Sequence, residues 1–135
     1  MPGLVVNIDV PDMAAAEAFY IEALGLRIGR RLDEDIVELL GADVPIFLLQ
    51  KNAGTRIGPA GGDVRHYDRH WSPIHLDFGV GDLTAAIGRA LAAGAVQEGE
   101  ILDAPYGKQA MFADPFGHGF CLIEFNERGY DAYLD

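Results

Sequence analysis

The sequence contains an internal repeat, and this repeat restricts the fold more than any other feature. The segment LVVNIDVPDMAAAEAFYIEALGL has a counterpart in the second half of the chain, IHLDFGVGDLTAAIGRALAAGA. Each segment opens with an apolar run that ends in Val, passes through Pro-Asp or Gly-Asp into an Ala-rich stretch, and ends with a Gly between apolar residues. The short runs IFLLQKN (46–52) and FCLIEFN (120–126) then follow in the same order. Such a repeat predicts two similar modules.

Each repeated segment predicts a helix directly after its aspartate. Asp12 and Asp82 stand where a side chain can accept hydrogen bonds from the free N–H groups of a first helical turn. The Ala, Leu and Glu residues that follow favour helix, and Gly25 and Gly94 stand where such helices would end. The predicted helices cover residues 12–24 and 82–93.

The segments that open the two repeats alternate in side-chain character, as expected of strands. Such alternation places one strand face on a core and turns the other face away from it. The residues on the second face are Val5, Asn7 and Asp9 in the first repeat and His75, Asp77 and Gly79 in the second. Further strands are predicted at residues 26–31, 35–40, 45–50, 96–101, 108–113 and 119–125. Each repeat then has the order strand, helix and three strands, which predicts an α+β fold.

The expected organisation is a single domain of residues 1–135 made of two modules. Module 1 covers about residues 3–52, module 2 about residues 72–126, and residues 127–135 form a tail that docks on the body or on a partner chain. The intervening segment, about residues 53–71, is rich in Gly and charge, so it is a linker or a lid. A plain floppy connection is the alternative interpretation.

Composition excludes some classes of partner. The formal net charge of −11 argues against nucleic acid, because phosphate binding needs clustered Lys and Arg. The charge suits a cationic ligand through long-range attraction. The alternative interpretation is that the excess of acidic residues only keeps the protein soluble. No apolar run reaches the roughly 18 residues of a membrane span, and MPGLVV shows no signal-peptide pattern. The single cysteine, Cys121, cannot form an internal disulfide, so we expect a cytoplasmic protein.

Three segments resemble one known family: VPDMAAAEAFYIEALGL, VGDLTAAIGRALAAGA and FADPFGHGFCLIEF. They are similar to the vicinal oxygen chelate superfamily, which includes glyoxalase I, extradiol dioxygenases, and the fosfomycin and bleomycin resistance proteins. The resemblance covers roughly residues 3–126. It implies paired βαβββ modules, each rolling its sheet into a half-open barrel around a cavity. It also implies a homodimer, with the concave sheet face lining the site.

The resemblance implies four metal-ligand positions, and two of them lack donor atoms. These positions fall on Val5 and His75 in the first strand of each module, and on Phe47 and Cys121 in the last strand, where Glu is usual in the metal enzymes. His75 is the only residue that matches a usual ligand of the family. Because a divalent ion needs several protein ligands, no metal or other cofactor is predicted. A divalent metal would need additional ligands from Asp77, His66, His70 or Glu38, and Cys would favour a soft metal such as zinc.

The resemblance and the side-chain pattern together suggest a ligand pocket. Its predicted members are His75, Asp77, Cys121, Asn7, Phe47, Trp71 and Tyr106. His75 with Asp77 is the candidate catalytic pair, since a neutral imidazole can accept or donate a proton near neutral pH. The leading hypothesis is a metal-free protein that binds a small organic molecule, either cationic or aromatic. The alternative is a lyase or dioxygenase of the glyoxalase I type that uses His75, with or without a metal.

Overall fold

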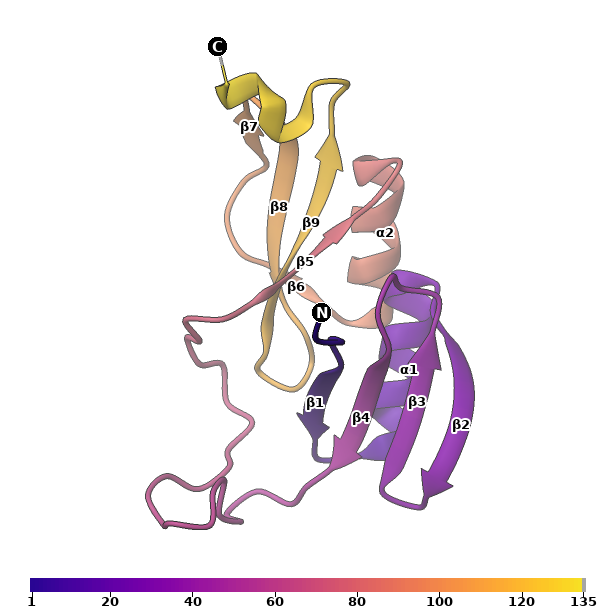
Figure 1. Cartoon of the computed structure of the whole chain (residues 1–135), viewed down its shortest axis with the longest axis vertical. Coiled ribbons are helices and arrows are strands. Elements are labelled where there is room, and N and C mark those ends of the chain that lie inside the picture. Colours follow the sequence, from indigo (N-terminus) through magenta and orange to yellow (C-terminus); the bar gives the residue numbers. More distant parts are fainter. Residues whose placement is uncertain (135) are drawn as a thin grey trace. The chain divides into compact units, whose positions relative to one another are not determined.

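The computed structural model describes residues 1–134, and the chain forms two compact units (Figure 1). Unit 1 covers Met1–Asp68 and unit 2 begins at Arg69. Each unit contains a mixed sheet and one α-helix in the order that the repeat predicts. The α+β class with paired βαβββ modules is therefore confirmed. None of the described helices is long and apolar enough to cross a membrane.

Unit 1 is a four-stranded sheet with one helix. Its elements are β1 (Val6–Val10), α1 (Met13–Leu24), β2 (Arg27–Asp33), β3 (Ile36–Leu40) and β4 (Ile46–Gln50). The strand order is β1-β4-β3-β2, in which β1 pairs parallel with β4 and the other neighbours are antiparallel. The first and last strands of the module thus lie side by side, and this pairing brings residues distant in sequence onto one sheet face.

Unit 2 repeats this topology with one difference in its second strand. Its elements are β5 (Leu76–Gly79), α2 (Leu83–Ala93), β6 (Val96–Gln97), β7 (Leu102–Ala104), β8 (Gly107–Ala113), β9 (Gly119–Phe125) and the 3-10 helix η1 (Gly129–Tyr133). The predicted strand 96–101 is wrong as one element, because β6 and β7 pair separately with β8. Between them, Gly99 has φ +82°, which a continuous strand cannot accommodate.

The pairing of first and last strands fixes which residues correspond between the units. Asn7 pairs with Phe47 across β1 and β4, and Asp77 pairs with Cys121 across β5 and β9. Each pair lies one step after the start of its first strand, so Val5 in unit 1 corresponds to His75 in unit 2. The correspondence that the resemblance implied is therefore present in the strand register.

The two helices begin with the same pair of capping interactions. Asp12 and Asp82 each accept a hydrogen bond at 3.1 Å from the backbone N–H three residues later, which confirms their predicted role. Gln50, the last residue of β4, and Glu124, the next-to-last residue of β9, accept hydrogen bonds from the first helical N–H at 2.8 and 2.9 Å. Each helix is thereby tied to the end of its own sheet.

One face of each sheet packs beneath its helix and forms the core. In unit 1 the fully buried sheet residues are Val10, Val37, Leu39, Ile46 and Leu48. In unit 2 they include Ala110, Phe112 and Leu122, which lie on the face that packs with the buried side of α2. We call the opposite sheet face of unit 2 the open face; it carries Asp77, Gln109, Met111, Cys121 and Ile123, which are cross-strand partners.

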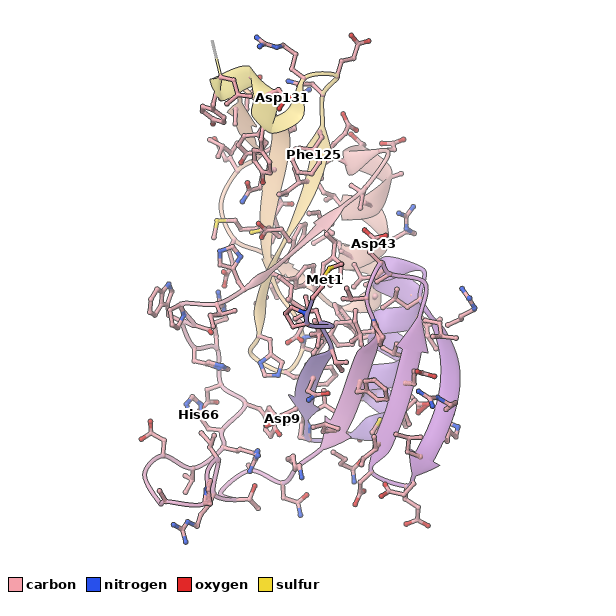
Figure 2. The ribbon with its side chains drawn as sticks, viewed as in Figure 1. Met1, Asp9, Asp43, His66, Phe125 and Asp131 are labelled. Carbon is pink, nitrogen blue, oxygen red and sulfur yellow. The ribbon has the colours of Figure 1, made fainter. Side chains whose placement is uncertain are left out.

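The segment after β4 is tied to unit 1. Asp9 of β1, which is labelled in Figure 2, forms an ion pair with Arg65, with 2.8 Å between Oδ2 and Nε. The Tyr67 hydroxyl donates to the backbone carbonyl of Lys51 at 2.6 Å, and an isolated β-bridge joins Arg56 and Val64. The segment thus makes an ion pair, a hydrogen bond and a β-bridge within unit 1.

Candidate functional site

A cluster of three donor groups stands on the open face of unit 2. Nδ1 of His75 lies 2.9 Å from Oδ1 of Asp77, and these two side chains together with Cys121 place one nitrogen, one oxygen and one sulfur within 4.8 Å of one another. Strand alternation sets His75 and Asp77 on the same face, and the β5–β9 register sets Asp77 beside Cys121. His75 and Asp77 are half-exposed, whereas Cys121 is buried.

Two further polar side chains extend this cluster. The amide Nε2 of Gln109 donates to Sγ of Cys121 at 3.3 Å, and the Tyr106 hydroxyl donates to Oε1 of the same amide. Tyr106 is among the predicted pocket residues, but Gln109 is not. Alternation along β8 could have indicated Gln109, since it lies two residues before Met111 on the same face.

Burial controls the ionisation of the thiol and the phenol. Burial is the main cause that raises the pKa of Cys121; the Gln109 hydrogen bond lowers it, and nearby Asp77 raises it. Burial also raises the pKa of Tyr106, with smaller contributions from Tyr130 and Tyr133. Both groups therefore stay protonated near neutral pH, so Cys121 lacks the low pKa of a reactive nucleophile.

A small cavity of about 70 Å³ adjoins the cluster. Its lining includes Arg69, Trp71, Ser72, His75, Met111 and Cys121. Trp71 is 81% exposed and Met111 is 51% exposed, so both present apolar surface to an approaching molecule. The cavity thus combines apolar walls with a polar edge, which is the usual make-up of a small-molecule site.

An ion pair holds one wall of this cavity. Both carboxylate oxygens of Glu98 accept from the Arg69 guanidinium, at 2.7 Å from Nε and 2.9 Å from Nη2. The hydrogen bonds from Arg69 lower the pKa of Glu98. Gly119 leaves room for this arrangement, because an added Cβ would lie 2.7 Å from Nη2 of Arg69. No local sequence pattern predicts this ion pair, because Arg69 and Glu98 lie 29 positions apart.

The remaining predicted pocket residues belong to unit 1. Asn7 and Phe47 are cross-strand neighbours in β1 and β4, where Asn7 is exposed and Phe47 half-buried. The structure therefore groups the predicted residues by unit: Asn7 with Phe47 in unit 1, and His75, Asp77, Cys121, Trp71 and Tyr106 in unit 2.

The donor groups fit a metal only in part. Of the four possible recruits, Asp77 joins His75 and Cys121. Glu38 is instead engaged by Arg30 at 2.8 and 3.0 Å, and neither His66 nor His70 belongs to this cluster of described residues. A nitrogen, oxygen and sulfur set matches zinc better than magnesium or manganese, which prefer oxygen. In unit 1 the corresponding Val5 and Phe47 have no donor atom.

Comparison with known proteins defines the family. A family model described as the glyoxalase-like domain matches residues 5–123. The anthracycline biosynthesis protein DauV of Streptomyces sp. (strain C5) is 35% identical over 140 residues, which cover 100% of this chain and 46% of DauV. The chain thus spans about half the length of this relative and of DnrV from Streptomyces peucetius (35% identity, 98% of this chain, 45% of DnrV). Ethylmalonyl-CoA/methylmalonyl-CoA epimerase of Cereibacter sphaeroides is 31% identical, over 90% of this chain and 94% of the epimerase.

Solved structures agree on the fold. The fosfomycin resistance protein FosX from Listeria monocytogenes superposes with a TM-score of 0.70 at 18% identity, covering 95% of this chain and 94% of FosX. TnmS3, an antibiotic binding protein from Streptomyces sp. CB03234, gives 0.63 at 20% identity, covering 93% and 97%. At these identities the likeness concerns the fold alone. The family model and the similarity to the epimerase, together with this shared fold, show that this chain belongs to the glyoxalase-like domain family of the vicinal oxygen chelate superfamily.

Proposed function

We propose that this protein binds a small organic molecule on the open face of unit 2 and does so without a metal. The observation that carries the proposal is the make-up of the cavity, where Trp71 and Met111 offer apolar surface beside the polar edge of His75. Asp77 already engages Nδ1 of His75. Val5 and Phe47 supply no ligand atoms at the corresponding places in unit 1.

The ligand that suits this site is aromatic or cationic. Exposed Trp71 offers a ring face for stacking or for a cation, and the net charge of −11 attracts cations while it disfavours nucleic acid. The names of DauV and TnmS3 connect two similar proteins with antibiotics, one by biosynthesis and one by binding. A planar antibiotic that bears an amino group is therefore the first class to test.

A homodimer is part of this proposal. The cavity of about 70 Å³ is far smaller than the roughly 300–1,000 Å³ that drug-sized ligands occupy. A second copy of the chain would supply additional wall. Light scattering after size-exclusion chromatography is expected to give twice the chain mass, and a monomer that binds the ligand with full affinity would contradict this part.

Calorimetric titration with an anthracycline that carries an amino sugar tests the binding function. We expect binding to the wild type, with a loss of about tenfold or more in Trp71→Ala because its ring stacking is removed. Ile57→Ala is the matched control, since Ile57 is an exposed apolar residue of unit 1. Failure of a panel of aromatic and cationic compounds to bind the wild type would refute the function.

A second function is favoured by the contact between His75 and Asp77. A histidine held by a carboxylate at 2.9 Å can move a proton at a carbon next to a carbonyl. The epimerase similarity covers 94% of that relative and makes acyl thioesters the substrates to try. Exchange of the α-hydrogen of methylmalonyl thioester in D₂O, followed by NMR and lost in His75→Ala, would establish this activity. Exchange that persists in His75→Ala would exclude a role for this residue.

Elemental analysis of the purified protein decides the metal-dependent alternative. We expect no stoichiometric zinc, manganese or nickel, and unchanged ligand binding after treatment with a chelator. One zinc ion per chain that disappears in both His75→Ala and Cys121→Ala would instead establish a centre built on His75, Asp77 and Cys121.

A further inference from the structure

A chain of polar contacts crosses the open face of unit 2 in the order of its strands. It runs from Tyr106, which precedes β8, through Gln109 of β8 and Cys121 of β9 to Asp77 of β5, and it ends at His75. We call these five residues the polar chain. Its links join residues from three neighbouring strands, so the sheet register holds them together.

The first links of the polar chain have a defined donor direction. The Tyr106 hydroxyl donates to Oε1 of Gln109, and this orients the amide so that Nε2 donates to Sγ of Cys121 at 3.3 Å. Because the sulfur accepts from Gln109, the thiol proton of Cys121 is left to point elsewhere. The Asp77 carboxylate, across the β5–β9 register, is the adjacent acceptor.

The opposite amide orientation would be unfavourable. If Oε1 of Gln109 faced the sulfur, it would take the thiol proton, and the carboxylate of Asp77 would then face sulfur lone pairs. Such an arrangement leaves the Asp77 carboxylate without the thiol proton as its donor, and this loss costs free energy beside a buried sulfur. Cys121 is only 3% exposed, so water does not compensate readily.

The last link fixes the hydrogen of the histidine ring. An ionised carboxylate can only accept hydrogen bonds. Since Oδ1 of Asp77 lies 2.9 Å from Nδ1 of His75, Nδ1 carries the hydrogen. In the neutral ring Nε2 then has a lone pair, and no hydrogen bond or ion pair engages this atom within residues 1–134. The His75 side chain is 52% exposed and lines the cavity, so this acceptor is accessible to a ligand.

Aromatic rings anchor the far end of the polar chain. The ring of Tyr106 lies 5.2 Å from that of Tyr130 and 6.0 Å from that of Phe125, measured between centroids. Tyr130 belongs to η1, the helix that also carries Asp131 and lies beside Phe125 at the end of β9 (Figure 2). The tail thereby restrains the Tyr106 hydroxyl that sets the donor direction.

We propose that the polar chain holds His75 as the Nδ1–H tautomer, and that its Nε2 therefore accepts a hydrogen bond from an ammonium group of the ligand. Asp77, Cys121, Gln109 and Tyr106 are positioning residues in this scheme. The ligand half of the inference rests on the proposed binding function, whereas the tautomer is a property of the free protein. Two kinds of experiment separate these halves.

Nitrogen NMR of the histidine rings tests the tautomer without any ligand. In the wild type, the neutral form of the His75 ring is expected to show a pyrrole-type Nδ1 and a pyridine-type Nε2. Asp77→Asn offers only one acceptor oxygen for two donors, so it is expected to shift His75 toward the other tautomer. Asp103→Asn is the matched control, because Asp103 is exposed on the other face of the same sheet. A pyridine-type Nδ1 in the wild type would overturn the proposal.

Raman spectroscopy tests the donor direction at the sulfur, since the chain has a single cysteine and hence a single S–H band. Tyr106→Phe removes the hydroxyl that orients Gln109 and keeps the ring, so the S–H band is expected to move. Tyr130→Phe keeps the aromatic packing and leaves Gln109 oriented, so its band is expected to match the wild type. An unchanged band in Tyr106→Phe would contradict the orienting role of Tyr106.

Paired ligands test the acceptor role of His75. An anthracycline with a free amino group is compared with its N-acylated, N-methylated analogue, which lacks that donor. We expect the wild type to bind the free amine at least about tenfold more tightly, and His75→Ala to lose this preference. Equal affinities in the wild type would refute the ligand half. If neither compound nor a wider panel binds, the binding function fails, while NMR alone still decides the tautomer.

Discussion

At the scale of single residues, the open face of unit 2 depends on groups that keep their protons. Cys121 is held by burial and by its neighbours as a neutral thiol, and Tyr106 is held as a neutral phenol. Neutral donors next to the Asp77 carboxylate favour a site that recognises a ligand by hydrogen bonds. A reactive cysteine would need the opposite environment, with a cation or helix N-terminus that lowers its pKa.

The raised pKa of Cys121 predicts a pH-dependent stability. The folded protein holds the thiol proton more tightly than the unfolded chain, so the contribution is present below the unfolded value of about 8.5 and is lost as pH rises through the folded value. Urea unfolding is expected to show the wild type losing stability relative to Cys121→Ala between neutral and strongly alkaline pH. Parallel pH profiles for the two proteins would contradict the shift.

Gly107 is predicted to be costly to replace, since it lets the chain turn after Tyr106. Its φ is +145°, and an added Cβ would lie 2.1 Å from the carbonyl oxygen of Glu124. Because backbone rather than a flexible side chain is in the way, Gly107→Ala is expected to cost about 2–3 kcal/mol of unfolding free energy. Gly99→Ala is the control: Gly99 also has positive φ, but no atom lies within 4 Å of its Cβ position, so about 1 kcal/mol is expected. Urea denaturation measures both, and equal losses would contradict the clash.

At the scale of elements, each helix is fixed to its sheet by a shared pattern. An aspartate caps the helix, and a side chain near the end of the module's final strand accepts from the first helical N–H. This side chain is Gln50 in unit 1 and Glu124 in unit 2. The second strand of unit 2 departs from the pattern. Its interruption places Glu98 where it holds Arg69, so the departure contributes to the cavity wall.

The repeated caps predict additive effects. Asp12→Ala and Asp82→Ala are each expected to lower the unfolding free energy by about 1 kcal/mol, because each leaves an N–H group of the first turn without its partner. Each cap holds the helix of its own unit, so the double variant is expected to lose the sum. Asp43→Ala, in the exposed loop before β4, is the matched control. Chemical denaturation measures the effects, and a loss equal to that of Asp43→Ala would contradict the capping role.

At the scale of the whole molecule, the charge of −11 is expected to attract a cationic ligand before any contact forms. Long-range attraction raises the association rate of a cation and is screened by salt. Stopped-flow quenching of Trp71, the only tryptophan, is expected to show the association rate of a cationic anthracycline falling about tenfold between low and high salt. A neutral analogue is the control. Equal salt dependence for both compounds would rule out steering by charge.

The sequence by itself determined the features that depend on residues close together in the chain. Helix caps at Asp12 and Asp82 follow from a side chain and backbone three residues apart. The common face of His75 and Asp77 follows from strand alternation. The repeated order of these local signals then predicted the paired modules, because two similar segments reach similar folds.

Only the tertiary structure decided the contacts between distant segments. Asp77 meets Cys121 through the pairing of β5 with β9, and Arg69 meets Glu98 across 29 positions. The hydrogen bond from Gln109 to Cys121 depends on the antiparallel pairing of β8 with β9. Strand register and ion pairing over such separations depend on how the whole module packs, and no local pattern of side chains encodes them.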